Sequence, residues 1–456
     1  MLTSVRKCRV CGRESLEPVL DLGNQYLSGQ FVRSAEEPVC ERFPLEMMRC
    51  LGCGLVQLRH SIDLGSMYNR YWYRSGINDT MRLHLAEVAQ VAVGSFRGER
   101  LGAILDIGCN DGTLMSALRN TNPSVRLVGI DPSNAVEDAS VSGIYRGFFP
   151  QDLPEQGLFD LVFSLACFYD VEDPVAFARA VRQRLSPQGF WVIEVASLID
   201  ILRNHAYDTV CHEHLEYYSF DALEYILGRA GLEVWDVSHT DTNGGSLLVC
   251  ACLPGAYRVT NEVGTVREEE AKAHGCPGRA ARRFASFSRG VEERLDELHN
   301  LLARLHGEGK RIHVYGASTK GNVILQSADI VGFVECCADR NPQKWGCHTL
   351  GTNLPIVSEE ESRRLKPDYY LALPWAFRKE FTKREKGSGI PMIFPLPKVS
   401  VWLNNGDSDG RDQIERDQDP FRRRCDEEGW SEPFWRQDDR IRVWTAGAHF
   451  ERQRDA

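Results

Sequence analysis

Two cysteine pairs constrain the first part of this chain more than any other feature of its sequence. Cys8 and Cys11 form one C-x₂-C pair, Cys50 and Cys53 form a second, and a glycine follows each pair. Two thiolates at this spacing can bind one ion from a tight turn, and the glycine permits the positive φ angle that points backbone N–H groups at the sulfurs. Four thiolates match tetrahedral Zn²⁺ and leave no open coordination position, so the pattern predicts a structural zinc site.

The segment between the two pairs is longer than in a compact zinc finger, so a small domain has to fill it. Its short apolar stretches alternate with turn residues, which predicts a β-rich unit over residues 1–70. The alternative is a small core that contains two redox-inert cysteine pairs without metal. Cys40 is the only further cysteine nearby that could replace a ligand.

The overall charge narrows the classes of partner. The 456 residues include 64 acidic and 54 basic ones, which gives a net charge of −10. A general nucleic-acid-binding protein usually carries a basic stripe, so we expect no nucleic-acid partner. No apolar run reaches the length of about 18 residues that a membrane span needs, and residues 1–10 lack the apolar core of a signal peptide. We therefore expect a cytoplasmic protein with no membrane partner.

Strand and helix signals alternate after the cysteine unit, which predicts a parallel sheet with crossover helices. A charged stretch with helical periodicity follows, and a second, smaller strand–helix series begins at Arg311. The predicted organisation is a zinc-binding unit over 1–70, a larger α/β unit over 71–255, a helical connector over 256–310, a second α/β unit over 311–403 and a charged tail over 404–456.

The tail differs in composition from the rest of the chain. Its basic residues are all arginine, mixed with Asp, Glu and Gln, which predicts an exposed, partly disordered segment. Trp430, Trp435 and Trp444 lie within it, so part of the tail could pack on the body of the protein or on a neighbouring subunit. A homo-oligomer held together through the tail is therefore left open.

Residues 104–113, ILDIGCNDGT, read as a buried strand that runs into a glycine turn and then a helix. The spacing is not the G-x-G-x-x-G of dinucleotide-binding folds. The pattern D-x-G-x-x-x-G resembles motif I of class I S-adenosylmethionine-dependent methyltransferases, whose loop passes under the methionine part of the cofactor. The resemblance implies a cofactor site that includes Asp106, Gly108, Asn110, Asp111 and Gly112.

The next strand ends in Asp131, which is 131 − 106 = 25 positions after Asp106. An acid at that strand end can accept hydrogen bonds from both ribose hydroxyls, although a lone Asp there is often only a helix cap. Phe148 and Phe149 follow and could flank the adenine. Ser164 ends the third strand over the expected cofactor cleft, so we include it in the cofactor site.

Residues 207–219, YDTVCHEHLEYYS, hold more polar groups than a routine loop. H-E-H is not H-E-x-x-H, so the zinc-protease motif is excluded. A Glu beside a His can set the tautomer of the imidazole and raise its basicity. Such a His could remove a proton from a carbon next to a carbonyl, and a nearby Tyr could stabilise the enolate oxygen. The alternative is a surface loop in which Ser219 caps a helix.

Together these motifs resemble the nucleotide-sugar C-methyltransferase family, which adds branching methyl groups to deoxysugars. The resemblance covers residues 5–403. Besides the cysteine quartet and the cofactor loop, its motifs are YWYRSG (71–76), HEHLEYYS (212–219), NGGS (243–246) and YGASTKG (315–321). It implies an α/β fold in which a small zinc domain precedes a class I methyltransferase Rossmann-like domain and a second Rossmann-like domain follows. The sugar nucleotide is expected between the last two.

The resemblance also implies a mechanism on a 4-keto-6-deoxy nucleotide sugar. A base removes the proton at C3, and the resulting enolate carbon attacks the methyl group of S-adenosylmethionine in line. His214 matches the base of the family, with Glu213 beside it. Tyr73, with Tyr71 as the alternative, matches a tyrosine near the reacting sugar.

The last unit contributes candidates for substrate binding. The GASTKG segment opens a helix, so its backbone N–H groups and Lys320 could bind a diphosphate. The same glycines could instead form only a tight turn between a strand and a helix. The remaining substrate-binding candidates are Tyr217, Asn243 and Ser318.

Three positions depart from the family pattern. Cys211 stands where a Tyr or Phe is frequent, and Asn243 replaces a His before two glycines. A His that the family carries after the fourth strand is missing, and we expect Tyr169 to substitute for it. These changes leave two alternatives open. One is an O- or N-methyltransferase of a related carbohydrate or small metabolite, in which His214 deprotonates a hydroxyl. The other is a non-catalytic binding or scaffold protein.

Overall fold

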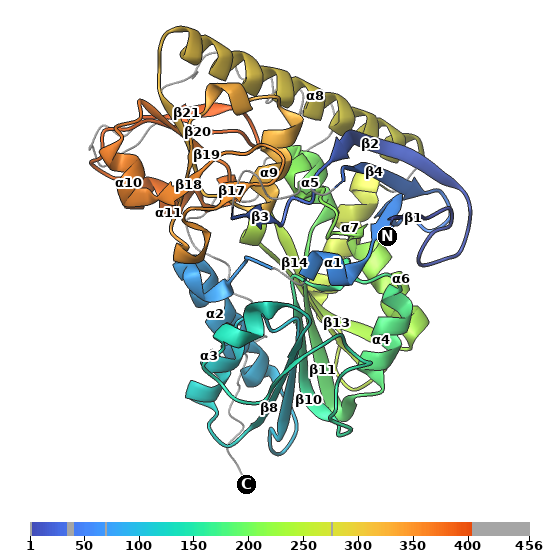
Figure 1. Cartoon of the computed structure of the whole chain (residues 1–456). Helices are drawn as coiled ribbons and strands as arrows, with labels where there is room; N and C mark the ends of the chain where they lie inside the picture. Colours follow the sequence, from blue (N-terminus) through green and yellow to red (C-terminus); the bar gives the residue numbers. More distant parts are fainter. Residues whose placement is uncertain (1, 34–40, 69–70, 275–276, 404–456) are drawn as a thin grey trace.

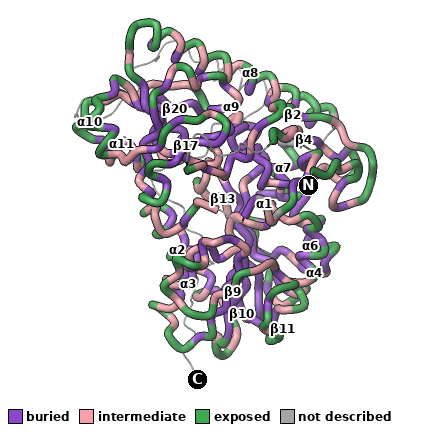
Figure 2. Tube along the Cα trace, in the orientation of Figure 1, coloured by how far each residue is buried: buried purple, intermediate pink, exposed green. Residues whose placement is uncertain are grey.

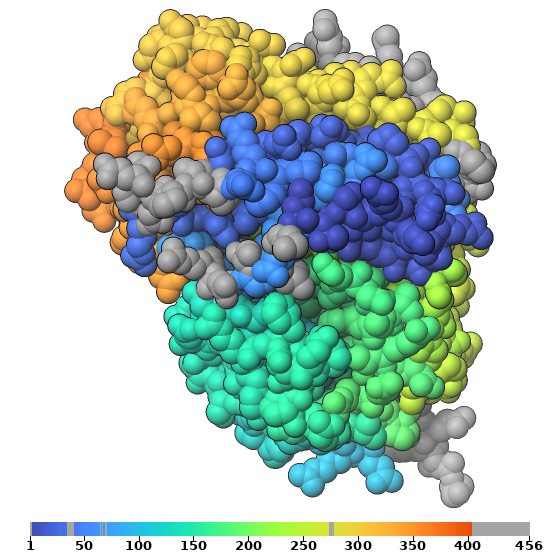
Figure 3. Space-filling view, turned by 45° about the vertical axis from the view of Figure 1, so that its right-hand side comes forward, coloured from blue at the N-terminus to red at the C-terminus, as the bar shows by residue number. Residues whose placement is uncertain are grey.

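The N-terminal unit lies between two α/β units, and Figure 3 shows it (blue) in contact with both. The computed structural model describes residues 2–33, 41–68, 71–274 and 277–403 (Figure 1). The predicted α/β class, with a small β-rich unit ahead of two Rossmann-like units, is confirmed. Cys40 and the predicted charged tail lie outside the described residues.

The N-terminal unit is built on a four-stranded antiparallel sheet with the order β12-β5-β4-β2. Its strands are β2 (Leu16–Gln25), β4 (Phe43–Cys50), β5 (Val56–Leu58) and β12 (Glu216–Tyr217). The unit also contains β1 (Leu2–Ser4), β3 (Phe31–Val32), β6 (His60–Ile62) and α1 (Leu64–Tyr68). Strand β12 comes from the HEHLEYYS segment, far along the chain. The N-terminal sheet is therefore completed by the segment that the sequence marks as reactive.

The central unit has the seven-stranded sheet of a class I methyltransferase fold, in the order β13-β14-β11-β10-β7-β8-β9. Its strands are β7 (Ala103–Ile107), β8 (Arg126–Asp131), β9 (Ile144–Arg146), β10 (Phe159–Leu165), β11 (Leu185–Ala196), β13 (Glu233–Thr240) and β14 (Ser246–Cys252). Strands β7 to β11 are parallel, and β14 runs antiparallel to both of its neighbours. Every residue of β7 is buried, as expected for a parallel strand with both faces covered.

Helices cover both faces of this sheet. On one face, apolar side chains of α2 and α3 pack against the strands, and on the other face those of α4, α6 and α7 do so. These helices are α2 (Asp79–Ser95), α3 (Thr113–Thr121), α4 (Pro174–Arg182), α6 (Phe220–Ala230) and α7 (Asn261–His274). Asn78 caps α2 and Ser219 caps α6, each through a side-chain oxygen that accepts backbone N–H groups.

The C-terminal unit has a six-stranded sheet, parallel except for its last strand. Its strands are β15 (Ile312–Tyr315), β16 (Cys337–Asp339), β18 (Ile356–Ser358), β19 (Tyr369–Ala372), β20 (Met392–Phe394) and β21 (Ser400–Trp402), and β17 (His348–Thr349) pairs with β3 of the N-terminal unit. The helices are α8 (Pro277–Gly307), α9 (Thr319–Ser327), α10 (Glu359–Arg364) and α11 (Arg378–Arg384). The long helix α8 runs along this unit and reaches β2 (Figure 1).

Short helical segments connect many of these helices and strands. They are α5 (Leu198–Asn204) and the 3₁₀ turns η1 (Ser75–Ile77), η2 (Asn134–Asp138), η3 (Phe168–Asp170), η4 (Tyr207–Thr209), η5 (Thr242–Gly244), η6 (Val331–Phe333), η7 (Pro342–Lys344) and η8 (Trp375–Phe377). No helix among the described residues is both long and apolar enough to cross a membrane.

The buried residues lie mainly along the sheets (Figure 2). One hydrophobic core joins the N-terminal and C-terminal units. Met47 and Val56 of the first unit belong to the same apolar cluster as Val314 and Leu371 of the last. Residues 207–217 pass through this shared core, where Cys211 and Leu215 are fully buried. Both units therefore fix the path of this segment.

Candidate active site

A cavity of about 850 Å³ opens between the three units. The central unit contributes the cofactor loop and the ends of β8, β10 and β11, and the C-terminal unit contributes the residues around Gly316–Lys320. Residues 71–78, ahead of α2, form a further wall. This volume lies in the upper part of the range for ligand sites.

The glycine turn after β7 forms one end of the cavity. Gly108, Asn110 and Gly112 all adopt positive φ angles, of 76°, 51° and 71°. The backbone N–H of Gly108 donates to the carbonyl of Ile130 over 2.8 Å, and that of Asn110 donates to Oδ2 of Asp131 over 2.9 Å. A Cβ on Gly108 would lie 2.8 Å from the Cys167 side chain, so position 108 requires glycine for both space and φ angle.

Asp131, Phe148 and Phe149, the residues that the sequence suggests for the ribose and the adenine, line the same end of the cavity. Asp131 is held by Ser133, whose backbone N–H and hydroxyl donate to Oδ1 over 2.8 and 2.5 Å. Phe149 packs against Phe177 with ring centroids 5.1 Å apart. A backbone cradle, a strand-end carboxylate and two apolar rings fit S-adenosylmethionine, which has an amino-acid part, a ribose and an adenine.

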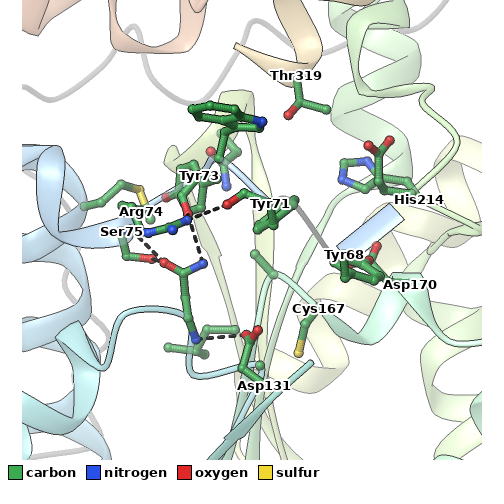
Figure 4. A pocket seen from close by; sticks show the side chains of 18 of the residues that line it. Tyr68, Tyr71, Tyr73, Arg74, Ser75, Asp131, Cys167, Asp170, His214 and Thr319 are labelled. Carbon is green, nitrogen blue, oxygen red and sulfur yellow. Dashed lines mark hydrogen bonds between the residues drawn. The ribbon is translucent and has the colours of Figure 1, made fainter. Parts of the chain in front are cut away.

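Residues 71–76 lie along the cofactor loop and are bonded to it (Figure 4). The backbone N–H of Ser75 donates to Oδ1 of Asn110 over 3.0 Å, and that of Gly76 donates to Oδ2 of Asp111 over 2.8 Å. Arg74 is buried, and its NH1 donates to the carbonyl of Tyr71 over 2.6 Å. These bonds hold Tyr71 and Tyr73, which both precede Arg74, beside the loop.

Several predicted site residues do not line the cavity. The hydroxyl of Ser164 accepts from the indole N–H of Trp191 over 3.0 Å, so this side chain points into the core. Burial raises the pKa of Asp106 to about 8, and Oδ2 of this residue has no hydrogen-bond partner among the described residues. Asp111 accepts a hydrogen bond from the 71–76 segment, and Gly112 is the N-cap of α3. Tyr217 lies in β12 within the shared core.

His214 faces the cavity with a defined tautomer (Figure 4). Its Nδ1 lies 2.8 Å from the carbonyl oxygen of Thr209, and a carbonyl can only accept, so Nδ1 carries the proton. Nε2 is then the unprotonated, basic nitrogen. Burial, together with the charge of Lys320, lowers the pKa of His214 to about 3, which keeps the ring neutral.

The expected role of Glu213 in setting this tautomer is wrong. Its Oε1 accepts the backbone N–H of Gly29 over 3.1 Å, and its Oε2 accepts from the hydroxyl of Ser28 over 3.4 Å. The carboxylate of Glu213 lines the cavity, but its hydrogen bonds go to the N-terminal unit. His214 is oriented instead by the carbonyl of Thr209. Residues 211–214 form a turn, closed by a hydrogen bond of 3.1 Å from the backbone N–H of His214 to the carbonyl of Cys211, and the two adjacent side chains leave this turn in different directions.

Aromatic groups surround the imidazole. The ring of Tyr169 lies 4.4 Å from that of His214, between ring centroids. Tyr71 lies between Tyr68 and Tyr73, at 5.5 and 6.5 Å. The hydroxyl of Tyr68 donates to Oδ2 of Asp170 over 3.0 Å, and burial raises the pKa of Asp170 well above its usual range.

Tyr68, Asp170 and Glu194 line the cavity but were not predicted. Glu194 lies near the end of β11, where its Oε2 accepts from His84 over 2.9 Å and its Oε1 accepts from Thr240 over 3.1 Å. Burial lowers the pKa of His84, but the hydrogen bond and charge of Glu194 outweigh this effect and raise it. An acid inside the apolar run WVIEVA was the available signal, because an unpaired charge is rarely buried.

The C-terminal wall carries Ser318, Lys320 and Asn243 together. Ser318 caps α9 by accepting the backbone N–H of Gly321 over 2.9 Å. Lys320 reaches across to donate to the carbonyl of Asn243 over 3.4 Å, and Asn243 has a positive φ of 56°. This wall therefore presents one ammonium group beside a helix N-terminus.

The four predicted zinc ligands come together in the N-terminal unit. Their Sγ atoms lie within 4.8 Å of one another, with 3.5 Å between Cys8 and Cys53 and between Cys11 and Cys50. Zn–S bonds of about 2.3 Å in a tetrahedron require sulfurs about 3.8 Å apart. The donor set and its spacing therefore fit one Zn²⁺ ion.

We expect Cys50→Ser to lower the zinc content from about one ion per chain to nearly none and to lower the melting temperature, because a structural zinc site contributes directly to folding. Elemental analysis and thermal unfolding measure both effects. Cys250→Ser is the matched control, because this thiol is equally buried but lies in the central core. Full zinc occupancy in the Cys50 variant would contradict the assignment.

Comparisons with known proteins follow the same division of the chain. Residues 8–68 match a family described as "Putative zinc binding domain", residues 81–237 match "Methyltransferase domain" and residues 241–397 match "C-methyltransferase C-terminal domain". The predicted methyltransferase domain, S-adenosylmethionine cofactor and zinc-binding domain are thereby confirmed.

Individual relatives differ in how much of the chain they match. C-methyltransferase NovU of Streptomyces niveus is 30% identical over 417 residues, which cover 87% of this chain and 97% of that protein. A tRNA U34 carboxymethyltransferase of Campylobacter lari is 30% identical over 108 residues, or 21% of this chain and 36% of that protein. A solved S-adenosylmethionine-dependent methyltransferase from Clostridium acetobutylicum matches with a TM-score of 0.30 and 14% identity, over 38% of this chain and 91% of that one.

The match to NovU spans nearly the whole of both proteins, and the three matched families cover the zinc-binding, cofactor-binding and C-terminal parts of one chain. An enzyme is thereby favoured over the scaffold alternative. The chain belongs to the C-methyltransferase family and is an S-adenosylmethionine-dependent C-methyltransferase.

Proposed function

We propose that this C-methyltransferase acts on a nucleotide-linked keto-deoxysugar, at the carbon C3 next to a 4-keto group. The observation that carries the proposal is the orientation of His214, which presents an unprotonated Nε2 to the cavity that also contains the cofactor loop. A neutral base beside a methyl-donor site suits the removal of a proton from carbon. A small-molecule substrate also fits the size of the cavity.

In this mechanism His214 breaks the C3–H bond by taking the proton on Nε2. The electron pair moves into the C3–C4 bond, and the negative charge develops on the carbonyl oxygen as an enolate. S-adenosylmethionine, when bound, supplies the electrophilic methyl group for the new C–C bond. Thr209 keeps the imidazole in place throughout, because its carbonyl can hold Nδ1–H in both the neutral and the protonated ring.

Phenols that line the cavity are suited to the enolate oxygen. Burial raises the pKa of Tyr71 well above its usual range, and a phenol with the ordinary pKa of about 10 is already protonated at neutral pH, so Tyr71 and Tyr73 are both hydrogen-bond donors. Tyr73 is 42% exposed towards the cavity opening, which leaves room for a substrate to approach it. We assign the oxygen contact to Tyr73, with Tyr71 as its neighbour, and the wall beside the imidazole to Tyr169.

The diphosphate is assigned to the C-terminal wall. Lys320 provides a charge, and the first turn of α9 provides backbone N–H groups without partners inside the helix. Asn243 lies beside Lys320 and completes this part of the substrate site. The cytoplasmic location and a homo-oligomer through the tail remain predictions.

Carbon-acid chemistry predicts exchange without methyl transfer. In D₂O, with S-adenosylhomocysteine in place of the methyl donor, the enzyme should exchange the C3 proton of its substrate from a panel of 4-keto nucleotide sugars. His214→Gln should slow this exchange by at least about 100-fold while sparing cofactor binding, because it removes the general base. Mass spectrometry measures exchange, and calorimetry measures cofactor binding.

His239→Gln is the matched control for this experiment, because His239 lies on β13 outside the cavity lining. O-methyl or N-methyl product without C–H exchange would overturn the carbon-acid mechanism and favour the corresponding alternative. Wild-type exchange in the His214 variant would remove this residue from the mechanism.

The low pKa of His214 predicts an unusual pH profile. Because burial holds this pKa at about 3, the base remains neutral over the whole range from pH 7.5 down to 5.5. The exchange rate at saturating substrate should therefore change little over this range. A histidine with the ordinary pKa of about 6.5 would lose about 90% of its neutral form, and a matching tenfold fall in rate would contradict the assignment.

The diphosphate assignment predicts a specific loss of nucleotide affinity. Lys320→Met should raise the dissociation constant for uridine or thymidine diphosphate by about 10-fold or more, because a charge-assisted hydrogen bond is lost. Calorimetry with both nucleotides measures this effect. Lys379→Met is the control, because Lys379 is exposed on α11 and lies outside the cavity lining. If both variants lost affinity for the nucleotide equally, the loss would reflect net charge and would contradict a specific contact of Lys320.

A further inference from the structure

We propose that Arg9, in the first zinc-binding knuckle, is a positioning residue for His214. Arg9 would act by holding Glu216 and, through it, the strand that follows the base. This inference rests on the role proposed above for His214. It gives the zinc-binding domain a part in the reaction, because the metal site and the base are then linked by a short chain of buried contacts.

The N-terminal unit bonds the residues on both sides of His214. Nε2 of His212 lies 3.3 Å from the carbonyl of Phe43, and Glu213 accepts from Gly29 and Ser28. After the base, the carbonyl of Leu215 accepts the backbone N–H of Leu58 over 2.9 Å. His214 itself turns the other way, into the cavity. The N-terminal unit therefore holds the base from both sides without covering it.

Arg9 and Glu216 form the buried side-chain link in this arrangement. Nε of Arg9 lies 3.5 Å from Oε1 of Glu216, and the two side chains are 5% and 0% exposed. No described residue donates a hydrogen bond to either carboxylate oxygen of Glu216. Burial raises the pKa of Glu216, and the charge of Arg9 opposes that rise. Arg9 is therefore the group that compensates this buried carboxyl.

The zinc knuckle fixes Arg9 from the other side. Cys8 and Cys11 flank it in sequence, so metal binding defines the turn on which it lies. Its backbone N–H donates to Oε1 of Gln57 over 2.9 Å, and its NH2 donates to the hydroxyl of Ser61 over 2.8 Å. Gln57 is also the cross-strand partner of Glu216 in the β5–β12 pair. One continuous set of contacts thus links the metal site to Arg9, β5 and β12.

The position of the base relative to the substrate carbon depends on this set. His214 precedes Glu216 by two residues, so any shift of β12 moves the imidazole. A displacement of about 1 Å at a reacting group can cost about 100-fold in rate. Loss of the Arg9–Glu216 pair is therefore expected to lower kcat far more than it alters cofactor binding.

The double variant Arg9→Met/Glu216→Leu tests the link, because replacing both charges of a buried pair with apolar side chains often preserves stability. We expect kcat to fall about 10-fold to 100-fold while the KM for S-adenosylmethionine and the zinc content stay unchanged. Arg9→Lys should retain more activity than Arg9→Gln, since it keeps the charge. Arg59→Gln is the control, because the Arg59–Glu46 pair lies in the same unit at 2.8 Å and joins Arg59 to β4 rather than to β12.

A second readout needs no substrate. Diethyl pyrocarbonate modifies neutral imidazoles, and peptide mass spectrometry follows its reaction with His214. Labelling of His214 should be at least about 3-fold faster in the double variant than in the wild type, because a released segment opens more often, and it should be unchanged in Arg59→Gln.

These readouts separate the two proposals. Wild-type kcat and labelling in the folded double variant would overturn the role of Arg9. If His214→Gln retains full exchange activity, the proposed base is wrong, but the labelling rates still report whether Arg9 holds the segment. If the double variant loses zinc or unfolds, Arg9→Lys and Arg9→Gln decide the matter: equal kcat and labelling in these two would overturn the proposal.

Discussion

The pairing of β12 with β5 is the contact on which the architecture of the site depends. It brings Glu216 and Tyr217, more than 150 positions away in sequence, into the sheet of the zinc-binding unit. The preceding residues cross a core that the N-terminal and C-terminal units share. Because this segment cannot shift without disturbing both units, the imidazole of His214 has a defined place. A surface loop of the same composition would not have this rigidity, because few buried contacts would oppose its movement.

The same burial determines the electrostatics of the cavity. Removal of water lowers the pKa of His214 and raises the pKa values of Asp170, Glu213 and Tyr71. Each shift favours the neutral form, as expected when charge is transferred to a medium of low dielectric constant. The result is a cavity in which the imidazole of His214 is unprotonated and the phenols keep their protons. The proposed removal of a proton from carbon needs this combination, because a charged imidazolium could not accept the proton and a phenolate could not donate to an enolate oxygen.

Local sequence predicted the features that depend on short spacing. The C-x₂-C pairs, the glycine loop after β7 and the acid at the end of β8 follow from rules that act within a few residues, and all lie where their patterns indicated. Contacts across long stretches of chain were beyond such rules. Glu213 precedes His214, which suggested that the two interact, yet its partners are Gly29 and Ser28. Ser164 and Tyr217 were assigned to the site from their position in a motif, whereas the core takes up both side chains.

Each unit supplies a different part of the cavity, according to its contacts with the other two units. The central sheet supplies the glycine loop and the carboxylate at one end of the cavity, and the C-terminal unit supplies Lys320 and a helix N-terminus at the other. Between these ends the carbonyl of Thr209 holds the imidazole of His214. The zinc-binding unit holds the residues on either side of His214, through β5 and residues 28–29. If His214 is the base, as proposed, the metal site contributes to the reaction without contacting the substrate, because it holds the sheet to which the segment of His214 is bonded.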